Sequence, residues 1–208
     1  MDISLKCRCG SMRGVARNIA YEKCIHIVCL CDDCQAFAHY LGQAETVLDK
    51  YGGTDIFQLA PCNLHITQGA EHLQCLRLTD KGMYRWYAGC CKTPIANTAP
   101  MAKLPFAGMI HAFMDHAGDG QSRDQAVGPI RATLYGKFGI GHIPKGVHQA
   151  VPLGLIARIL RFLLSGWINN RHTPSPFFDL TTGKPVSAPY VLATFERDGL
   201  RKLCGPRP

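Results

Sequence analysis

The chain has 208 residues and a formal net charge of +8, with 47% hydrophobic and 18% charged residues. This composition is typical of a folded globular protein of one domain, or of one domain with an extension, and it excludes a disordered chain. The 11 cysteines are an odd number, which argues against a fully paired disulfide framework. The excess of positive charge favours anionic partners, without choosing among small acids, nucleic acid and membrane surfaces.

The first residues, MDISLKCRCGSMRG, contain no apolar run after a basic region. They therefore predict no secretory signal, and we expect a cytoplasmic protein. A reducing compartment keeps cysteines as thiols. Metal binding then explains the many cysteines better than disulfide bonds do.

Residues 1–100 predict an all-β region of short strands. Runs rich in β-branched and aromatic residues alternate with turn sequences such as GG, PCN, QGAE and TDKG. The predicted strands are TDIFQLA, NLHIT, LQCLRL and YRWYA, after a looser alternation in residues 15–31. Farther along, SRDQAVGPIRATLYGKF at residues 122–138 predicts a helix, and the Pro-rich residues from 173 onward lead to a possible last strand.

The segment VPLGLIARILRFLLSGWINNR, residues 151–171, predicts an amphipathic helix. Two arginines, two glycines and a proline argue against a membrane span. A basic amphipathic helix could lie on a lipid surface, but we expect this one to pack on the β domain. The two faces consist of Ile156, Ile159, Leu160, Leu163, Leu164 and Trp167 on the apolar side, and Arg158, Arg161, Ser165 and Asn169 on the polar side.

Three cysteine clusters carry the strongest functional signal: C-R-C at residues 7–9, C-L-C-D-D-C at residues 29–34, and C-C at residues 90–91. Residues two apart in a strand point to the same face, so a C-x-C pair can offer two thiolates to one ion. Zn²⁺ takes four ligands, and catalytic zinc sites keep one position open. Cys29, Cys31 and Cys34 therefore predict a three-thiolate site with an open position.

Two alternatives for this cluster remain open at this stage. The zinc could be structural and closed by His39, His26 or a distant cysteine, or the thiols could hold no metal. Asp32 and Asp33 could act as a base, but a turn that returns Cys34 to the other two cysteines explains them more simply.

Cys7 and Cys9 provide only two ligands, so a structural zinc site there needs two more from another part of the chain. Cys90 and Cys91 are the obvious candidates. A disulfide between Cys90 and Cys91 is disfavoured in a reducing compartment. The remaining cysteines are either reserve ligands (Cys24 and Cys75) or packing and surface thiols (Cys62 and Cys204).

The order of these motifs resembles the glutathione-dependent formaldehyde-activating enzyme (Gfa) family, which includes centromere protein V. The resemblance rests on C-x-C near the start, C-x-C-x-x-C about twenty residues later, Cys91-Lys92-Thr93, and the strand-rich residues 63–95. The resemblance covers about residues 3–100 and extends at most to residue 145. Ala88 stands where the family's later C-x-x-C-G-T motif has its first cysteine, and QAFAH at residues 35–39 replaces its usual basic residues.

The resemblance implies a mainly β fold of several small coiled sheets. It divides the chain into a Gfa-like zinc-binding β domain over residues 1–145 and a C-terminal extension, residues 146–208, that carries the amphipathic helix. It also implies two zinc ions: a structural one held by Cys7, Cys9 and the later pair, and a catalytic one held by Cys29, Cys31 and Cys34.

An open three-thiolate zinc site suits a soft ligand such as a substrate thiol, which it would hold deprotonated for attack on an aldehyde. Our leading hypothesis is therefore a zinc-dependent carbon–sulfur lyase that acts on glutathione or another small anionic thiol and its aldehyde adduct. The alternatives are a zinc-stabilised binding protein for nucleic acid, a membrane surface or a protein, and a sensor of oxidants or metals. Nucleic acid is not favoured, because the chain has no long basic tail and no aromatic–basic interleaving.

Overall fold

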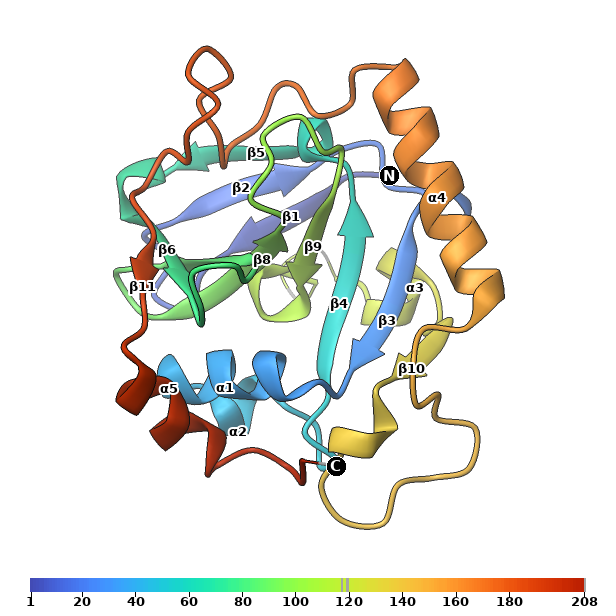
Figure 1. Ribbon diagram of the computed structural model, residues 1–208. Helices are drawn as coiled ribbons and strands as arrows, with labels where there is room; N and C mark the ends of the chain where they lie inside the picture. The colour runs from blue at the N-terminus through green and yellow to red at the C-terminus, as the bar shows by residue number, and fades with distance from the viewer. Residues whose placement is uncertain (117, 119, 208) are drawn as a thin grey trace.

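The computed structural model describes residues 1–116, 118 and 120–207, and within them eleven strands form two sheets (Figure 1). The smaller sheet has the order β1-β2-β5 and is antiparallel throughout. Its strands are β1 (Ile3–Lys6), β2 (Arg13–Ala16) and β5 (Leu64–Gln68).

The larger sheet has the order β10-β3-β4-β9-β8-β7-β6-β11. Its neighbouring strands are antiparallel except at the two edges, where β10 runs parallel to β3 and β11 runs parallel to β6. The strands are β3 (Ile25–Cys29), β4 (Thr54–Leu59), β6 (Leu73–Arg77), β7 (Tyr84–Ala88), β8 (Thr93–Thr98), β9 (Ala107–Ile110), β10 (Ala132–Leu134) and β11 (Tyr190–Val191).

The main core lies between the two sheets and is centred on Trp86, which is fully buried. Its indole N–H donates to the hydroxyl of Thr98 at 2.9 Å, so the one polar atom of this side chain is satisfied. Phe177 and Phe178 pack on the same indole, with ring centroids 5.0 and 6.1 Å away. The chain after residue 146 therefore contributes directly to the main core.

Five α-helices occur in the described residues. In Figure 1, α1, α2 and α5 lie together at one end of the larger sheet, and α4 runs along the outside of β3. A second apolar cluster, which includes Phe37, Leu76 and Tyr87, packs α1 on the sheet face that points away from the main core. The helices are α1 (Asp32–Tyr40), α2 (Ala44–Val47), α3 (Arg123–Val127), α4 (Leu153–Ile168) and α5 (Thr194–Arg201). Short 3-10 helices cover Tyr21–Lys23, Pro61–Asn63, Ala70–His72, His111–Phe113 and Gly136–Phe138.

This sheet-rich architecture agrees with the expected mainly β class, and β4, β5, β6 and β7 coincide with the four predicted strands. The expectation that residues 1–100 are all-β is wrong, because α1 and α2 lie within them. The helix predicted over residues 122–138 is wrong for most of its length. Ser122 caps α3 with a capping box, but α3 ends at Val127. Gly128 then has φ +77° and precedes a proline, so the chain leaves the helix and enters β10. Helix α5 was not predicted.

Helix α4 forms where its periodicity predicts it and contacts the β domain through Leu155, which packs with Ile25, but its predicted apolar face is not the buried one. Within α4 only Leu155 and Gly166 are buried. Four members of the predicted apolar face are exposed: Ile156 (38%), Leu160 (59%), Leu164 (59%) and Trp167 (46%). Among the described residues, no helix has both the length and the apolarity needed to cross a bilayer.

Candidate metal centres

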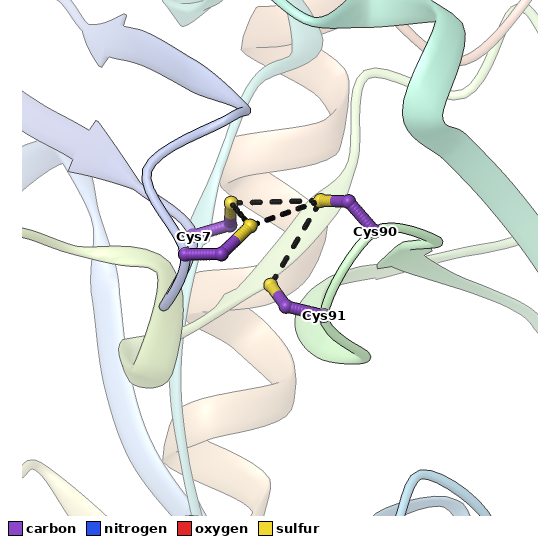
Figure 2. A group of neighbouring side chains, drawn as sticks. Cys7, Cys90 and Cys91 are labelled. Carbon is purple, nitrogen blue, oxygen red and sulfur yellow. Dashed lines mark hydrogen bonds between the residues drawn. The ribbon is translucent and has the colours of Figure 1, made fainter.

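The first cysteine group joins two turns that are far apart in sequence. Cys7 and Cys9 lie between β1 and β2, and Cys90 and Cys91 lie between β7 and β8. Figure 2 shows Cys7, Cys90 and Cys91 pointing into one space between these turns. The Sγ–Sγ distances are 3.5 Å for Cys7–Cys9, 3.8 Å for Cys7–Cys90, 3.4 Å for Cys9–Cys90 and 3.9 Å for Cys90–Cys91.

These distances fit a tetrahedral metal. A Zn–S bond of roughly 2.3 Å implies sulfur atoms about 3.8 Å apart at the corners of a tetrahedron. All four Sγ atoms lie within 4.8 Å of one another. Four sulfur ligands in this geometry suit zinc or iron. The structure thus brings together the four cysteines that the sequence pairs, in an arrangement that could hold a metal ion.

A tight turn allows two adjacent cysteines to face the same point. The backbone N–H groups of Cys91 and Lys92 both donate to the carbonyl of Ala88, at 3.4 and 2.8 Å. Lys92 has φ +62°, a left-handed conformation that normally favours glycine. Cys90, two residues after Ala88, thereby brings a fourth sulfur to this group.

Backbone and hydroxyl groups surround this first group. The N–H of Met12 donates to Cys7 Sγ at 3.3 Å, and the N–H of Arg8 donates to the Thr93 hydroxyl at 3.0 Å. That hydroxyl lies 3.1 Å from Cys91 Sγ. Hydrogen bonds with Ser11 lower the pKa of Cys9 to about 6, so a thiolate forms there at neutral pH.

The second group consists of Cys29, Cys31 and Cys34, whose Sγ atoms lie within 4.8 Å of one another. Cys29 ends β3, Cys31 is the N-cap of α1, and Cys34 lies in its first turn. Cys29 Sγ and Cys31 Sγ are 3.3 Å apart. Cys29 and Cys34 are buried, and Cys31 is half-buried.

Within the part of the chain that the structure describes, no fourth residue joins these three cysteines. His39 is not in the group. His26 is engaged elsewhere, because Nε2 lies 2.7 Å from a carboxylate oxygen of Asp55 and Nδ1 lies 2.7 Å from the carbonyl of Gly128. The histidine-closed alternatives therefore do not match this arrangement, and the group offers three ligands.

Asp32 and Asp33 form the first turn of α1 rather than a separate turn. Carboxylates are favourable at a helix N-terminus because of the helix dipole. The helical first turn itself brings Cys34 back toward Cys29 and Cys31.

Arg85 is the main neighbour that the sequence analysis missed. It comes from β7, is 4% exposed, and donates from Nη1 to Cys34 Sγ at 3.8 Å and to Asn97 Oδ1 at 3.2 Å. Its Nη2 lies 3.6 Å from a carboxylate oxygen of Asp33. The available signal was an arginine in the aromatic strand YRWYA, shortly before Cys90 and Cys91. Arg85 places a buried positive charge beside the three thiols.

Within the second group, the surroundings favour the thiolate form at Cys34. Hydrogen bonds from Cys29 and Cys31, together with the nearby Arg85 guanidinium, hold the pKa of Cys34 well below its ordinary value. The hydrogen bonds with Cys31 and Cys34, together with burial, raise the pKa of Cys29. The hydrogen bond with Cys29 lowers the pKa of Cys31, but Cys34 and burial outweigh it and raise the pKa to about 12.

Tyr135 is a second neighbour that the sequence analysis did not identify. It directly follows β10, is half-buried, and packs against the apolar surroundings of Cys29 and Cys34. Its φ of +62° is uncommon for an aromatic residue. Burial, followed by the nearby cysteines, raises the pKa of Tyr135, so its hydroxyl remains protonated at neutral pH.

The C-terminal segment packs over the start of α1. Arg201 forms ion pairs with Asp32 and Asp33, and Arg207 Nη2 lies 2.9 Å from Asp32 Oδ2. The thiol of Cys204 donates to the carbonyl of Asp32 at 3.5 Å. Cys204 therefore lies against the residue that follows Cys31, without joining its group.

Gln35 fixes the end of this segment. Its fully buried side chain donates to the carbonyls of Leu30 and Phe138 at 2.8 and 2.9 Å and accepts from Gly205 N–H at 2.8 Å. A Cβ on Gly205 would lie 2.0 Å from the carbonyl oxygen of Phe138, so only glycine fits there.

Arg201→Ala is expected to raise the alkylation rate of Cys204 about tenfold. The variant loses two of the three ion pairs that join the C-terminal segment to α1 and keeps the one from Arg207. A loss of roughly 1.4 kcal/mol increases the detached population tenfold. The rate is measured by pulsed alkylation and peptide mass spectrometry. Arg197→Ala is the control, because Arg197 pairs with Asp198 of its own helix. Equal rates in the two variants would contradict the role of Arg201.

The chain belongs to a family of unknown function, DUF6151, whose family model matches residues 2–189. A comparison with curated proteins finds no match. The matched range includes both cysteine groups, Arg85 and Tyr135, and it ends before α5.

Proposed function

We propose that this protein is a zinc-dependent carbon–sulfur lyase similar to the Gfa and centromere protein V family. It would add glutathione, or another small anionic thiol, to an aldehyde and catalyse the reverse reaction. In the forward direction a bond forms between sulfur and the carbonyl carbon, the carbonyl π bond breaks, and the thiol proton ends on the oxygen. The observation that carries this proposal is a group of three cysteines, joined by no fourth ligand from the described residues, beside a buried arginine.

The donor sets support two zinc ions. Cys7, Cys9, Cys90 and Cys91 would hold a structural ion in a Gfa-like domain of residues 1–145, since four thiol ligands close a site. Cys29, Cys31 and Cys34 would hold the second ion and leave room for an exchangeable ligand. When bound there, zinc supplies a soft Lewis acid that keeps a thiol deprotonated at neutral pH.

The side chains around the second group have separate roles in this proposal. Three thiolates and a divalent ion carry one net negative charge, and the Arg85 guanidinium offsets it at 3.8 Å from Cys34 Sγ. Tyr135, whose side chain packs beside Cys29 and Cys34, would give a proton to the aldehyde oxygen and recover one in the reverse step. The net charge of +8 attracts an anionic thiol.

Tyr135→Phe is expected to lower kcat for cleavage of S-hydroxymethylglutathione about 100-fold, with little change in KM and no loss of zinc. We expect kcat to fall because the variant lacks a proton donor, and we expect zinc to stay because the three thiols remain. The assay follows formaldehyde release in the zinc-loaded protein, and elemental analysis gives the zinc content.

Cys31→Ser tests the metal site itself. We expect it to lose about one zinc ion per chain and all activity while the protein stays folded. Cys62→Ser is the matched control, because Cys62 is half-buried and lies outside both cysteine groups. Wild-type zinc-loaded protein that is inactive on adducts of glutathione, cysteine and other small thiols would overturn the proposal and favour a non-catalytic binding protein.

A further inference from the structure

Helix α4 carries an apolar stripe that faces away from the rest of the protein. Its residues follow the spacing i, i+3, i+7, i+11 and i+15, which keeps them on one side of a helix. The stripe, with exposed fractions, consists of Leu153 (83%), Ile156 (38%), Leu160 (59%), Leu164 (59%) and Ile168 (72%), with Trp167 (46%) at its edge. Scattered exposed leucines are ordinary, but a stripe of this length marks a contact surface.

The opposite side of α4 anchors the helix, so the stripe is held outward. Leu155 packs with Ile25 and Leu134. A Cβ on Gly166 would lie 2.6 Å from the side chain of Pro105, which shows how closely the helix approaches that loop. At the edge of the stripe itself, the Trp167 indole N–H also ties the helix to the carbonyl of Lys103 at 2.8 Å. Figure 1 shows α4 at the margin of the molecule.

The sequence on both sides of α4 carries charge of a single sign. The sequence contains no aspartate or glutamate between Asp124 and Asp179. The same stretch contains six basic residues: Arg131, Lys137, Lys145, Arg158, Arg161 and Arg171. A surface of this kind attracts anions.

Three of these arginines line a groove of about 700 Å³ along one flank of α4. Among the described residues, Arg158, Arg161 and Arg171 form no ion pair with a carboxylate. Arg158 donates to the backbone carbonyl of Glu22 at 3.3 Å, and Arg171 donates to Asn63 Oδ1 at 2.9 Å. Glu22 also lines the groove. Because three arginines face this one carboxylate, the wall of the groove keeps an excess of positive charge.

We propose that α4 docks the protein on an anionic lipid surface, with the stripe among the acyl chains and the groove arginines on lipid phosphates. An outward apolar face flanked by arginines is the pattern of helices that lie in the membrane interface. Trp167, at the end of the stripe, has the amphipathic ring that prefers the headgroup level. Each basic residue near an anionic membrane adds to the attraction.

Charge complementarity favours lipid over a second copy of this chain. Arg158 and Arg161 lie near the middle of α4. Two such helices packed antiparallel about their midpoints would place cations against cations, with no acidic residue of α4 to pair them. An anionic lipid surface supplies the missing negative charge. It also covers the apolar stripe, which a polyanion in water would leave exposed.

The test is co-sedimentation of the zinc-loaded full chain with vesicles of phosphatidylcholine alone and with about 30 mol% phosphatidylserine. We expect binding to the anionic vesicles. A double variant, Leu160→Ser with Leu164→Ser, should bind them at least about tenfold more weakly. Arg161→Gln should weaken binding about fivefold. Leu203→Ser is the matched control, since Leu203 is 57% exposed and lies outside α4; it should bind like the wild type.

Three results would overturn the docking proposal. The first is no binding of the wild type to anionic vesicles. The second is equal binding by the double variant. The third is a concentration-dependent dimer that the double variant abolishes while wild-type protein ignores vesicles, which would assign the stripe to a second copy. All substituted side chains are on the surface, and circular dichroism checks that the variants fold.

Discussion

Cys7→Ser is expected to remove about one metal ion per chain and to lower the free energy of unfolding by at least about 3 kcal/mol. Cys7 is fully buried and joins the turn after β1 to the turn before β8 through Cys90 Sγ, 3.8 Å away. Binding a structural metal contributes directly to folding. Serine is a poor zinc ligand, so the variant would leave three cysteines in an incomplete site.

The measurements are zinc content by elemental analysis and unfolding by urea, both on purified full-length protein. Cys75→Ala is the matched control, because Cys75 is 2% exposed and belongs to neither cysteine group. It should keep all its zinc and lose only about 1 kcal/mol, as expected for a small cavity. Equal zinc content and equal stability in the two variants would show that the first group holds no structural metal.

Both cysteine groups could be predicted from the sequence for different reasons. The second is local, because a strand end, a cap and one helical turn bring Cys29, Cys31 and Cys34 together. The first depends on distant chain segments, and only the need of Cys7 and Cys9 for further ligands suggested their partners. The turn that lets adjacent Cys90 and Cys91 converge rests on a left-handed Lys92, which no residue preference predicts.

Arg85 and Tyr135, the side chains beside the second cysteine group, could not be predicted from the sequence. Strand pairing between distant parts of the chain places them there. Arg85 reaches Cys34 only because one face of β7 meets α1 while Trp86, on the other face, fills the main core. Tyr135 arrives through the parallel pairing of β10 with β3. The periodicity of the sequence does not predict which face of β7 α1 covers. It also does not predict which strand pairs with β3.

Helix α4 shows a related limit. Its amphipathic pattern predicts a helix with two faces, and the usual inference is that the more apolar face is buried. Here the contact with the β domain uses Leu155 and the small Gly166 against Pro105. The close approach at glycine fixes the orientation of the helix and leaves Leu160 and Leu164 outside. The orientation of the helix depends on the shape of one contact. A hydropathy pattern gives no information about such a contact.

Arg85→Met is expected to weaken zinc binding at the second group by about 10- to 100-fold and to lower the free energy of unfolding by roughly 3–5 kcal/mol. Methionine is also long and unbranched, so it keeps much of the packing on Phe37, whose ring centroid lies 5.6 Å from the guanidinium carbon. The variant removes the positive charge. Cys34 and Asp33 are then left without the cation that faces both of them.

Zinc affinity is measured by competition with a chromophoric chelator, counting the more weakly held ion, and stability by urea unfolding. Arg77→Met is the control, since Arg77 stacks on Tyr84 at 5.1 Å and has no described contact with either cysteine group. Arg85→Lys retains the charge but not the fork that reaches both Cys34 and Asn97. We therefore expect an intermediate affinity, measurable even if Arg85→Met fails to fold. Wild-type affinity in Arg85→Met, or in Arg85→Lys if Arg85→Met does not fold, would show that Arg85 is a packing residue rather than the counter-charge of the metal site.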